Sequence, residues 1–159
     1  MAFERNLEDN IFTLHDQLKN RTYCHDGYTT FHIHDPKHRI ISKATVKDRL
    51  VHHIIFNELY NIFEPSFIYH SYSSRLNKGT HLAIANLAKA LRKISNNYRN
   101  SAFVLKCDIR KFFTSVSHQK LLTMIKNRIN DEQFLWLTME IINSFCPAVD
   151  KFPEREREY

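Results

Sequence analysis

Glycine and proline are scarce in this chain of 159 residues, which has only two Gly and four Pro. Folds built mainly from strands and loops use both residues at their many turns. Their scarcity therefore argues against an all-β fold and for long helices with few strands. Apolar residues make up 43% of the sequence, enough for a packed core, which argues against wholesale disorder. The length suits one ordinary domain or part of a larger one.

Signs of disulfides, export and membrane insertion are missing too. The cysteines Cys24, Cys107 and Cys146 are odd in number and far apart, so they predict no disulfide framework and fit a reducing cytosol. The N-terminus carries mixed charge and lacks the apolar core of a signal peptide. No apolar run approaches the roughly 18 residues of a membrane span. We therefore expect a cytoplasmic protein with no membrane partner.

Positive charge is in excess. The formal net charge is +6, with ten His in addition, and the sequence pI is about 9.3. A basic domain favours a polyanionic partner, and nucleic acid is the commonest polyanion. Charge alone does not establish that partner, because many basic domains bind no nucleic acid.

Periodic apolar positions predict several helices. A short amphipathic helix falls within residues 5–20. The clearest helix covers residues 46–63, and Glu64-Pro65 ends it. Thr80 is expected to cap a third helix. The inward side of that helix is predicted to hold four aliphatic residues: Ile84, Leu87, Leu91 and Ile94.

Two segments alternate as strands do. Residues 28–42 predict a β-hairpin, because Asp35-Pro36 is a turn former between β-branched stretches. Residues 102–108 predict one more strand. Ser117 and Asp131 are expected to cap two further helices, which end near residues 129 and 145. The predicted fold class is α+β, mainly helical, with a hairpin and one additional strand.

Asp108 stands at the end of the predicted strand 102–108. Phe103, Leu105 and Cys107 share one apolar face that can pack on helices, and the opposite face ends in Asp108. A carboxylate held this way can bind a divalent metal. Phosphoryl transfer to a nucleic-acid 3′ end uses two divalent ions roughly 4 Å apart, bridged by carboxylates, so Asp108 would need a partner from another strand. The simpler interpretation, a strand-end or helix-capping Asp, stays open.

Two pairs of basic residues lie at expected turns. Lys37 and Arg39 are two residues apart, so they would share one side of a strand and could clamp a triphosphate. Arg75 and Lys78 lie in a polar loop before a helix start, an arrangement that can bind phosphate. An ordinary solvated turn and a plain linker remain the alternatives. The Cys and His residues of 24–34 match no standard zinc-finger spacing.

The order of these segments is more specific than any one of them. Four segments contribute: 31–41 with Asp-Pro-Lys-His-Arg, 46–52, 71–80, and 105–118 with Asp-Ile-Arg-Lys-Phe-Phe. In this order they resemble the N-terminal half of bacterial reverse transcriptases. The resemblance is closest to the group II intron-like, retron and diversity-generating retroelement lineages, and it covers roughly residues 28–145.

The resemblance implies a metal and sugar site around Asp108. Asp108 would be the family's first metal-binding Asp, and Ile109 would offer its backbone carbonyl to Mg²⁺. Phe113, five residues after the Asp, matches the steric gate that packs under the incoming sugar and excludes a 2′-OH. Asp48-Arg49 resembles the start of the fingers helix, with a structural role.

The resemblance also implies how substrates are held. Lys37 and Arg39 would close on the triphosphate of the dNTP, and Arg75 and Lys78 would lie near the template or the nucleotide. The partners implied are an RNA template, an RNA/DNA duplex and dNTPs.

The implied fold is an incomplete right-hand polymerase, with fingers over residues 1–100 and the start of the palm over residues 101–159. The family's Tyr-x-Asp-Asp motif is absent, and no Asp-Asp pair occurs in the chain. We therefore expect part of an RNA-directed DNA polymerase that is inactive alone and is completed by a missing C-terminal half. Two alternatives stay open: a non-catalytic relative that binds RNA or a partner protein, and a structural remnant without a ligand.

Overall fold

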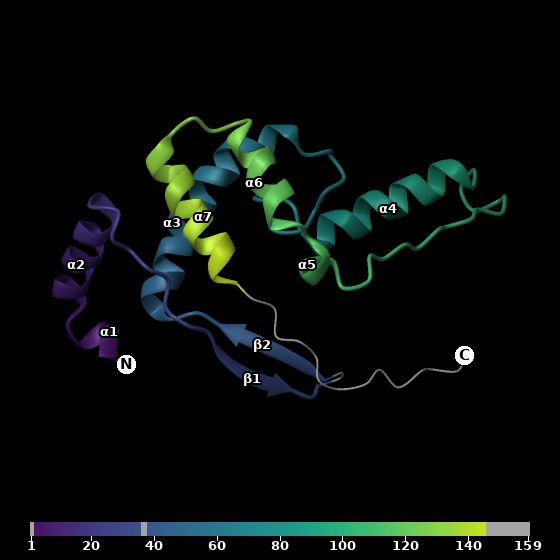
Figure 1. Cartoon of the computed structure of the whole chain (residues 1–159). Helices are drawn as coiled ribbons and strands as arrows, with labels where there is room; N and C mark the ends of the chain where they lie inside the picture. The colour runs from purple at the N-terminus through teal and green to yellow at the C-terminus, as the bar shows by residue number, and fades with distance from the viewer. Residues whose placement is uncertain (1, 36–37, 146–159) are drawn as a thin grey trace. The chain divides into compact units, whose positions relative to one another are not determined.

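A computed structural model describes residues 2–35 and 38–145 (Figure 1). The elements in chain order are α1 (Ala2–Arg5), α2 (Leu7–Lys19), β1 (Thr29–Ile33), β2 (Arg39–Lys43), α3 (Val46–Phe63), the 3₁₀ helix η1 (Glu64–Ser66), α4 (Thr80–Ile94), α5 (Phe112–Ser115), α6 (His118–Lys126) and α7 (Glu132–Ser144). No helix among the described residues is both long and apolar enough to cross a membrane.

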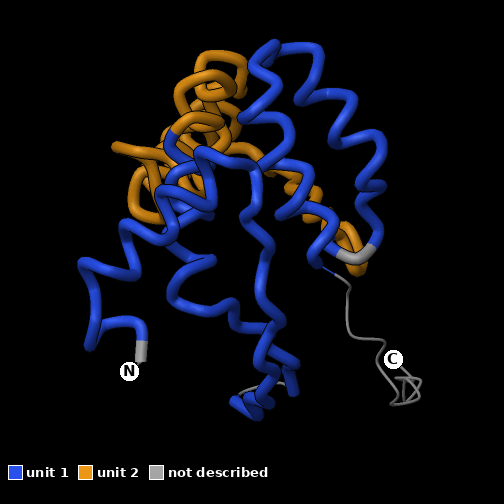
Figure 2. Tube along the Cα trace, turned by 60° about the vertical axis from the view of Figure 1, so that its left-hand side comes forward, with its two compact units in different colours: residues 1–57, 113–159 blue, residues 58–112 orange. Residues whose placement is uncertain are grey.

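The chain forms two compact units (Figure 2). The boundary between them falls within α3, whose residues up to Asn57 belong to the first unit. Unit 1 holds residues 1–57 and 113–159, and unit 2 holds residues 58–112. Among the described residues, the buried apolar side chains all belong to unit 1. They are Leu14, Tyr23, Ala44, Val51, Ile55, Ile125, Ile129 and Leu137.

Local sequence signals for the helices are confirmed at most positions. The helix predicted over residues 46–63 has those bounds, and η1 follows it where Glu64-Pro65 was expected to end it. Ser117 caps α6 by accepting a hydrogen bond from the Lys120 backbone N–H. Asp131 caps α7 in the same way, with its Oδ1 2.7 Å from the Phe134 nitrogen. Each cap satisfies a backbone donor that a helix start leaves without an intrahelical partner.

The predicted hairpin is confirmed. β1 and β2 pair antiparallel, with Thr29 opposite Lys43 and Ile33 opposite Arg39. Pro36 and Lys37 of its turn lie outside the described residues.

Three predictions about residues 80–108 are wrong in whole or in part. Residues 101–109 form no strand, and the described residues contain one sheet, made of β1 and β2. Phe103 is 99% exposed and Leu105 is 87% exposed, so the apolar face expected to pack on helices is open. A strand exists only when its backbone groups pair with a neighbour, and alternation in the sequence does not supply that neighbour.

The helix start at Thr80 is confirmed, but Thr80 does not cap it. Gly79 occupies the cap position of α4, and no side chain there makes a capping hydrogen bond. Of the four predicted inward residues, Ile84, Leu87 and Ile94 are exposed and Leu91 is half-buried. Amphipathic spacing identifies a helix face that can be buried, and a second surface has to be present before burial occurs.

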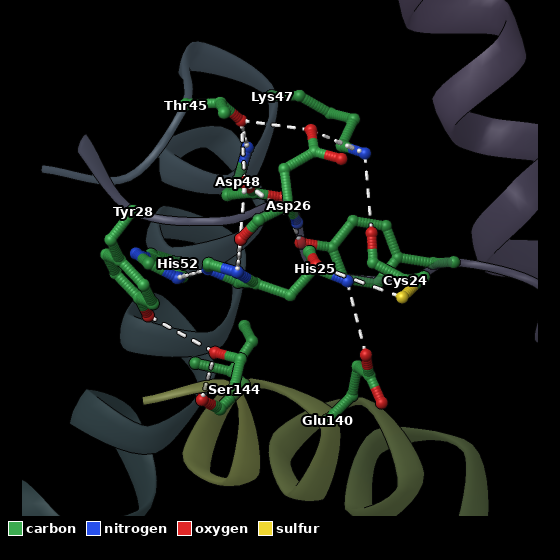
Figure 3. Close-up of polar contacts among 12 residues, drawn as sticks. Cys24, His25, Asp26, Tyr28, Thr45, Lys47, Asp48, His52, Glu140 and Ser144 are labelled. Atoms are coloured by element: carbon green, nitrogen blue, oxygen red, sulfur yellow. Dashed lines mark hydrogen bonds and ion pairs between the residues drawn. The ribbon is translucent and has the colours of Figure 1, made fainter. Parts of the chain in front are cut away.

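A buried carboxylate ties both ends of the hairpin to α3. Asp48, in the first turn of α3, is completely buried. Its Oδ1 accepts a hydrogen bond from the Tyr23 hydroxyl at 2.6 Å. Its Oδ2 accepts from the Thr45 hydroxyl at 2.6 Å and from the Asp26 backbone N–H at 3.3 Å (Figure 3). Tyr23 and Asp26 precede β1 and Thr45 follows β2, so one carboxylate fixes the base of the hairpin.

The strap, residues 23–28, is also held from a second side. The backbone N–H of His25 donates to Glu140 Oε1 on α7 at 3.2 Å. The hydroxyl groups of Tyr28 and Ser144 lie 3.2 Å apart (Figure 3). Residues of α7 therefore bind a segment more than 110 positions earlier in the chain.

Two histidines complete this network. The imidazole of His25 is fully buried, and its Nε2 lies 3.2 Å from Nε2 of His52. Nδ1 of His25 hydrogen-bonds to the carbonyl of Asp26 and therefore carries a proton. The two Nε2 atoms can share a hydrogen bond when only one of them carries a proton. If both rings were protonated, two N–H groups would face each other.

The surroundings shift the pKa values of these groups. Burial raises the pKa of Asp48, but the hydrogen bonds from Thr45 and Tyr23 and the nearby His25 outweigh it, so the pKa ends below its usual value. Burial and the hydrogen bond to Asp48 raise the pKa of Tyr23. Burial lowers the pKa of His52 below 6.5, and the neighbouring His25 and His53 lower it further.

Replacing Asp48 with Asn should destabilise unit 1. The amide keeps the shape but turns NH₂ toward donors that Oδ2 now accepts from, so we expect the free energy of unfolding to fall by about 2–3 kcal/mol. Urea titration followed by fluorescence of Trp136, the single Trp and a residue of α7, measures it. Asp16→Asn, at a carboxylate with a 72% exposed side chain, is the control. Equal midpoints for the two variants would contradict this role of Asp48.

Stability should also depend on pH through His52. The unfolded chain binds a proton near pH 6.5, and the folded chain binds it only at lower pH. Stability is therefore fully present above pH 6.5 and is lost as the pH falls toward the lower folded pKa. Urea midpoints measured in steps across this range should show that loss for the wild type and for His53→Gln. His52→Gln should remove most of it, and parallel curves for all three proteins would refute the assignment.

Candidate functional site

The loop between η1 and α4 is organised around Arg75. The Nε of Arg75 donates to Glu64 Oε2 at 2.8 Å, and its Nη2 donates to Glu64 Oε1 at 2.6 Å. Its Nη1 donates to the backbone carbonyls of Ile68 at 2.9 Å and Ser71 at 3.0 Å. The hydrogen bonds with Arg75 lower the pKa of the Glu64 carboxyl, and those with Glu64 raise the pKa of Arg75. The guanidinium therefore binds four acceptors within its own loop.

Lys78, in the same loop, lies against aromatic side chains. Its Nζ donates to the backbone carbonyl of Tyr69 at 3.0 Å and lies 3.7 Å from the centroid of the Tyr69 ring. The ring of Tyr72 is 5.6 Å from the same ammonium group. The loop thus holds one cation in an ion pair and a second cation beside exposed aromatic surface.

The hairpin presents different side chains on its two faces. Arg39 pairs across the sheet with Ile33, and alternation places Phe31 and Ile41 on the same face. The prediction that Lys37 joins Arg39 there falls outside the described residues.

Three histidines gather on the other face of the hairpin. Nδ1 of His32 lies 2.8 Å from Nε2 of His38, and the ring centroids of His34 and His38 are 4.8 Å apart. No group of three or more His, Cys, Asp or Glu in the described ranges has a geometry that could hold a metal ion. The rings of His32 and His38 are stacked, and those of His34 and His38 are tilted by 39°.

Asp108 and Ile109 are exposed in the extended segment that precedes α5. A carboxylate and a backbone carbonyl are the oxygen ligands that Mg²⁺ prefers. Two such ligands are too few for a site, and the described residues bring no further carboxylate, His or Cys to complete it. The residues that the structure describes therefore do not form a complete magnesium site.

Phe113 lies in α5 and is 82% exposed. It and Arg39 belong to unit 1, whereas Asp108, Ile109, Arg75 and Lys78 belong to unit 2. Within unit 2, the structure brings Arg75 and Lys78 into one ordered loop. Asp108 and Ile109 lie in a separate segment of that unit.

Charge is distributed unevenly between the two units. Unit 2 contains nine Lys and Arg against three Asp and Glu, so it carries the whole formal net charge of +6. Unit 1 is formally neutral. The excess positive charge is evident in the sequence. Its location in unit 2 is not, because the boundaries of the units come from the structure.

Sequence analysis also missed the aromatic residues beside Lys78 and the burial of Asp48. For Asp48 a signal was present. Thr45 followed three residues later by an acidic residue, just before an apolar run, is a helix-start pattern in which the two side chains meet. For Tyr69 and Tyr72 no such spacing rule exists, because an irregular loop brings them to Lys78.

Comparison with known proteins identifies the family. Residues 32–157 match the family described as reverse transcriptase (RNA-dependent DNA polymerase). A curated relative, named an uncharacterized 91 kDa protein in cob intron, from Schizosaccharomyces pombe, is 28% identical over 106 residues. That alignment covers 67% of this chain and 12% of the relative, so the chain spans about an eighth of the relative's length.

The family match covers more than half of the chain and includes β2, the Arg75 loop and the Asp108 segment. The chain therefore belongs to the reverse transcriptase (RNA-dependent DNA polymerase) family.

Proposed function

We propose that this chain supplies the fingers and the first part of the palm of an enzyme that adds dNTPs to a primer 3′ end on an RNA template. The observation that carries the proposal is the family match over residues 32–157, which includes Asp-Ile-Arg-Lys-Phe-Phe at positions 108–113. We assign residues 1–100 to the fingers and residues 101–159 to the palm. The relative's name places it in an intron, which favours the group II intron-like lineage over the retron and diversity-generating lineages.

In the complete enzyme, we propose that Asp108 and the carbonyl of Ile109 supply ligands to Mg²⁺, which would stabilise the attacking and leaving oxygens of nucleotidyl transfer. These 159 residues contain no Asp-Asp pair. We propose that the remaining carboxylates come from residues outside these 159, in the same polypeptide or in a second one, and that such a C-terminal half is a partner.

The hairpin and α5 would contact the incoming nucleotide. Arg39 and Lys37 carry the charges that suit a triphosphate, and the planar guanidinium of Arg39 can donate two parallel hydrogen bonds to it. Phe113 is exposed, as a ring that contacts a sugar must be. A bulky ring at that point would leave no room for a 2′-OH and would select dNTPs.

Unit 2 would contact the RNA template and the RNA/DNA duplex. Its charge of +6 suits a polyanion. Lys78 would bind the nucleic acid directly. Arg75, whose donors are engaged by Glu64 and two carbonyls, would shape the loop that presents Lys78. The cytoplasmic location stays a prediction.

A second function is favoured by the same charge distribution. A member of this family that has no catalytic centre could use unit 2 to bind RNA without polymerising DNA. Such a protein would bind RNA in a salt-sensitive way, and its affinity would not depend on Asp108.

Primer extension separates the two functions. The 159 residues alone should extend no primer, because a single carboxylate cannot assemble the two-ion site. The full reading frame, or this chain mixed with the missing half, should extend a DNA primer on an RNA template. Asp108→Asn should reduce that extension by about a thousandfold or more, which corresponds to several kcal/mol of lost transition-state stabilisation.

The matched control is Glu58→Gln, which removes another carboxylate of unit 2 and should leave extension unchanged. Asp108→Asn should leave the Kd for RNA within about twofold, because the residue is assigned to the metal and not to the template. Full extension by Asp108→Asn would exclude its catalytic role. Salt-sensitive RNA binding without extension by the complete wild type would favour the second function.

Selection against ribonucleotides tests Phe113. In the extending enzyme, Phe113→Val should open space for a 2′-OH and lower the preference for dNTP over rNTP by about tenfold or more. Phe112→Val, which removes the neighbouring ring in α5, should not change the preference for dNTP over rNTP. The measurement is the ratio of kcat/KM for the two nucleotides. Equal ratios in the wild type and Phe113→Val would show that another residue is the gate.

A further inference from the structure

Tyr69 is an exposed aromatic ring with a cation held against it. The residue is 63% exposed although Lys78 Nζ lies 3.7 Å from the centroid of its ring. His70 contacts the same ring at 86° to its plane, with the centroids 5.1 Å apart. A large part of the ring surface is therefore open beside a positive charge.

A hydrogen bond holds the ammonium group of Lys78 beside the ring. Its ammonium donates to the carbonyl of Tyr69 at 3.0 Å, so the residue that provides the ring also provides an acceptor for the cation. The bond uses one of three ammonium donors. The other two can reach an anionic group placed next to the ring.

The loop that carries Tyr69 is ordered by its own hydrogen bonds. The hydroxyl of Tyr72 lies 2.8 Å from Nδ1 of His70 and accepts from the Asn86 amide at 2.8 Å, which connects the loop to α4. The Leu76 backbone N–H donates to the Tyr60 hydroxyl on α3 at 2.9 Å. With the Arg75 bonds, these contacts hold the aromatic rings and Lys78 in place before any ligand arrives. Such preorganisation lowers the entropic cost of binding.

The chemistry of this surface suits an unpaired nucleobase. Proteins bind single strands by stacking bases on exposed aromatic rings while basic side chains contact the phosphates. Tyr69 and Lys78 offer both within 4 Å, in the unit that carries the entire net charge of +6. A base-paired duplex cannot use the ring in this way, because its bases are already stacked on one another.

We propose that the exposed ring of Tyr69 stacks on an unpaired base of a single-stranded nucleic acid, with the ammonium group of Lys78 against the adjacent phosphate. The proposal rests on the proposed function, since it names the residue that holds the unpaired part of the template. It gives unit 2 a preference for single strands over duplex that net charge alone does not produce.

The test compares RNA that has bases with a backbone that lacks them. Fluorescence anisotropy would measure the Kd of the full 159-residue protein for a labelled single-stranded RNA and for an abasic ribose-phosphate strand of the same length. Tyr69→Leu should weaken binding of the RNA by about tenfold and leave the abasic strand within about twofold. Tyr69→Phe, which keeps the ring, should bind both strands as the wild type does.

Two controls make the result specific. Tyr98→Leu removes a tyrosine of the same unit that is 62% exposed, and it should bind RNA as the wild type does. Lys78→Met should weaken both strands and lower the slope of log Kd against log salt concentration by about one, whereas Tyr69→Leu should leave the slope unchanged. The Trp136 unfolding midpoint and the far-UV circular dichroism confirm that each variant is folded.

The outcomes separate this proposal from the proposed function. If the wild type binds RNA and the variants Tyr69→Leu and Tyr98→Leu bind it equally well, the stacking role is overturned. The nucleic-acid function then still stands. Equal loss for both strands in Tyr69→Leu also overturns it, because the ring would then act on the backbone. Wild type that binds neither strand overturns the nucleic-acid function and the stacking role together.

Discussion

The carboxylate of Asp48 is the interaction on which the ordered part of unit 1 depends. It accepts hydrogen bonds from Tyr23 and Asp26, which precede β1, and from Thr45, which follows β2. A two-stranded hairpin is only marginally stable by itself in water. Contacts at its base are therefore needed to hold it in a fixed position on α3. The strap, residues 23–28, is in turn hydrogen-bonded to Glu140 and Ser144 of α7. The position of Arg39, at the start of β2, follows from that base.

The two units differ in burial and in charge. The buried apolar side chains described in the structure belong to unit 1, which is formally neutral. Unit 2 carries the net charge and exposes apolar side chains along α4 and over residues 103–105. Burial stabilises a fold, whereas exposed charge and aromatic surface serve binding. Unit 1 thus contains the buried apolar side chains, and unit 2 presents the charge and the aromatic surface on which the proposed binding of nucleic acid rests.

The elements predicted correctly from the sequence are those whose formation depends on residues close together in the chain. The bounds of α3, the hairpin, and the caps Ser117 and Asp131 each depend on residues within a few positions of one another. The prediction failed at residues 102–108, where a strand needs a partner that alternation does not provide. The Asp48 carboxylate joins positions 22 and 25 apart, and the links from the strap to α7 join positions 115 and 116 apart. The candidate site residues were named through the family resemblance, and the geometry of the Arg75 loop could not be read from spacing.

Arg75 and Lys78 show why two basic residues of one loop need not act alike. The planar fork of arginine matches a carboxylate on one side and backbone carbonyls on the other, which makes it suited to bracing a loop. Lysine is a compact charge on a flexible stem and can keep donors available while one is bound. Exchanging the two would leave the net charge unchanged, but the ammonium at position 75 could not bridge Glu64 to two carbonyls. The charge of unit 2 therefore matters less for the loop than which cation stands at which position.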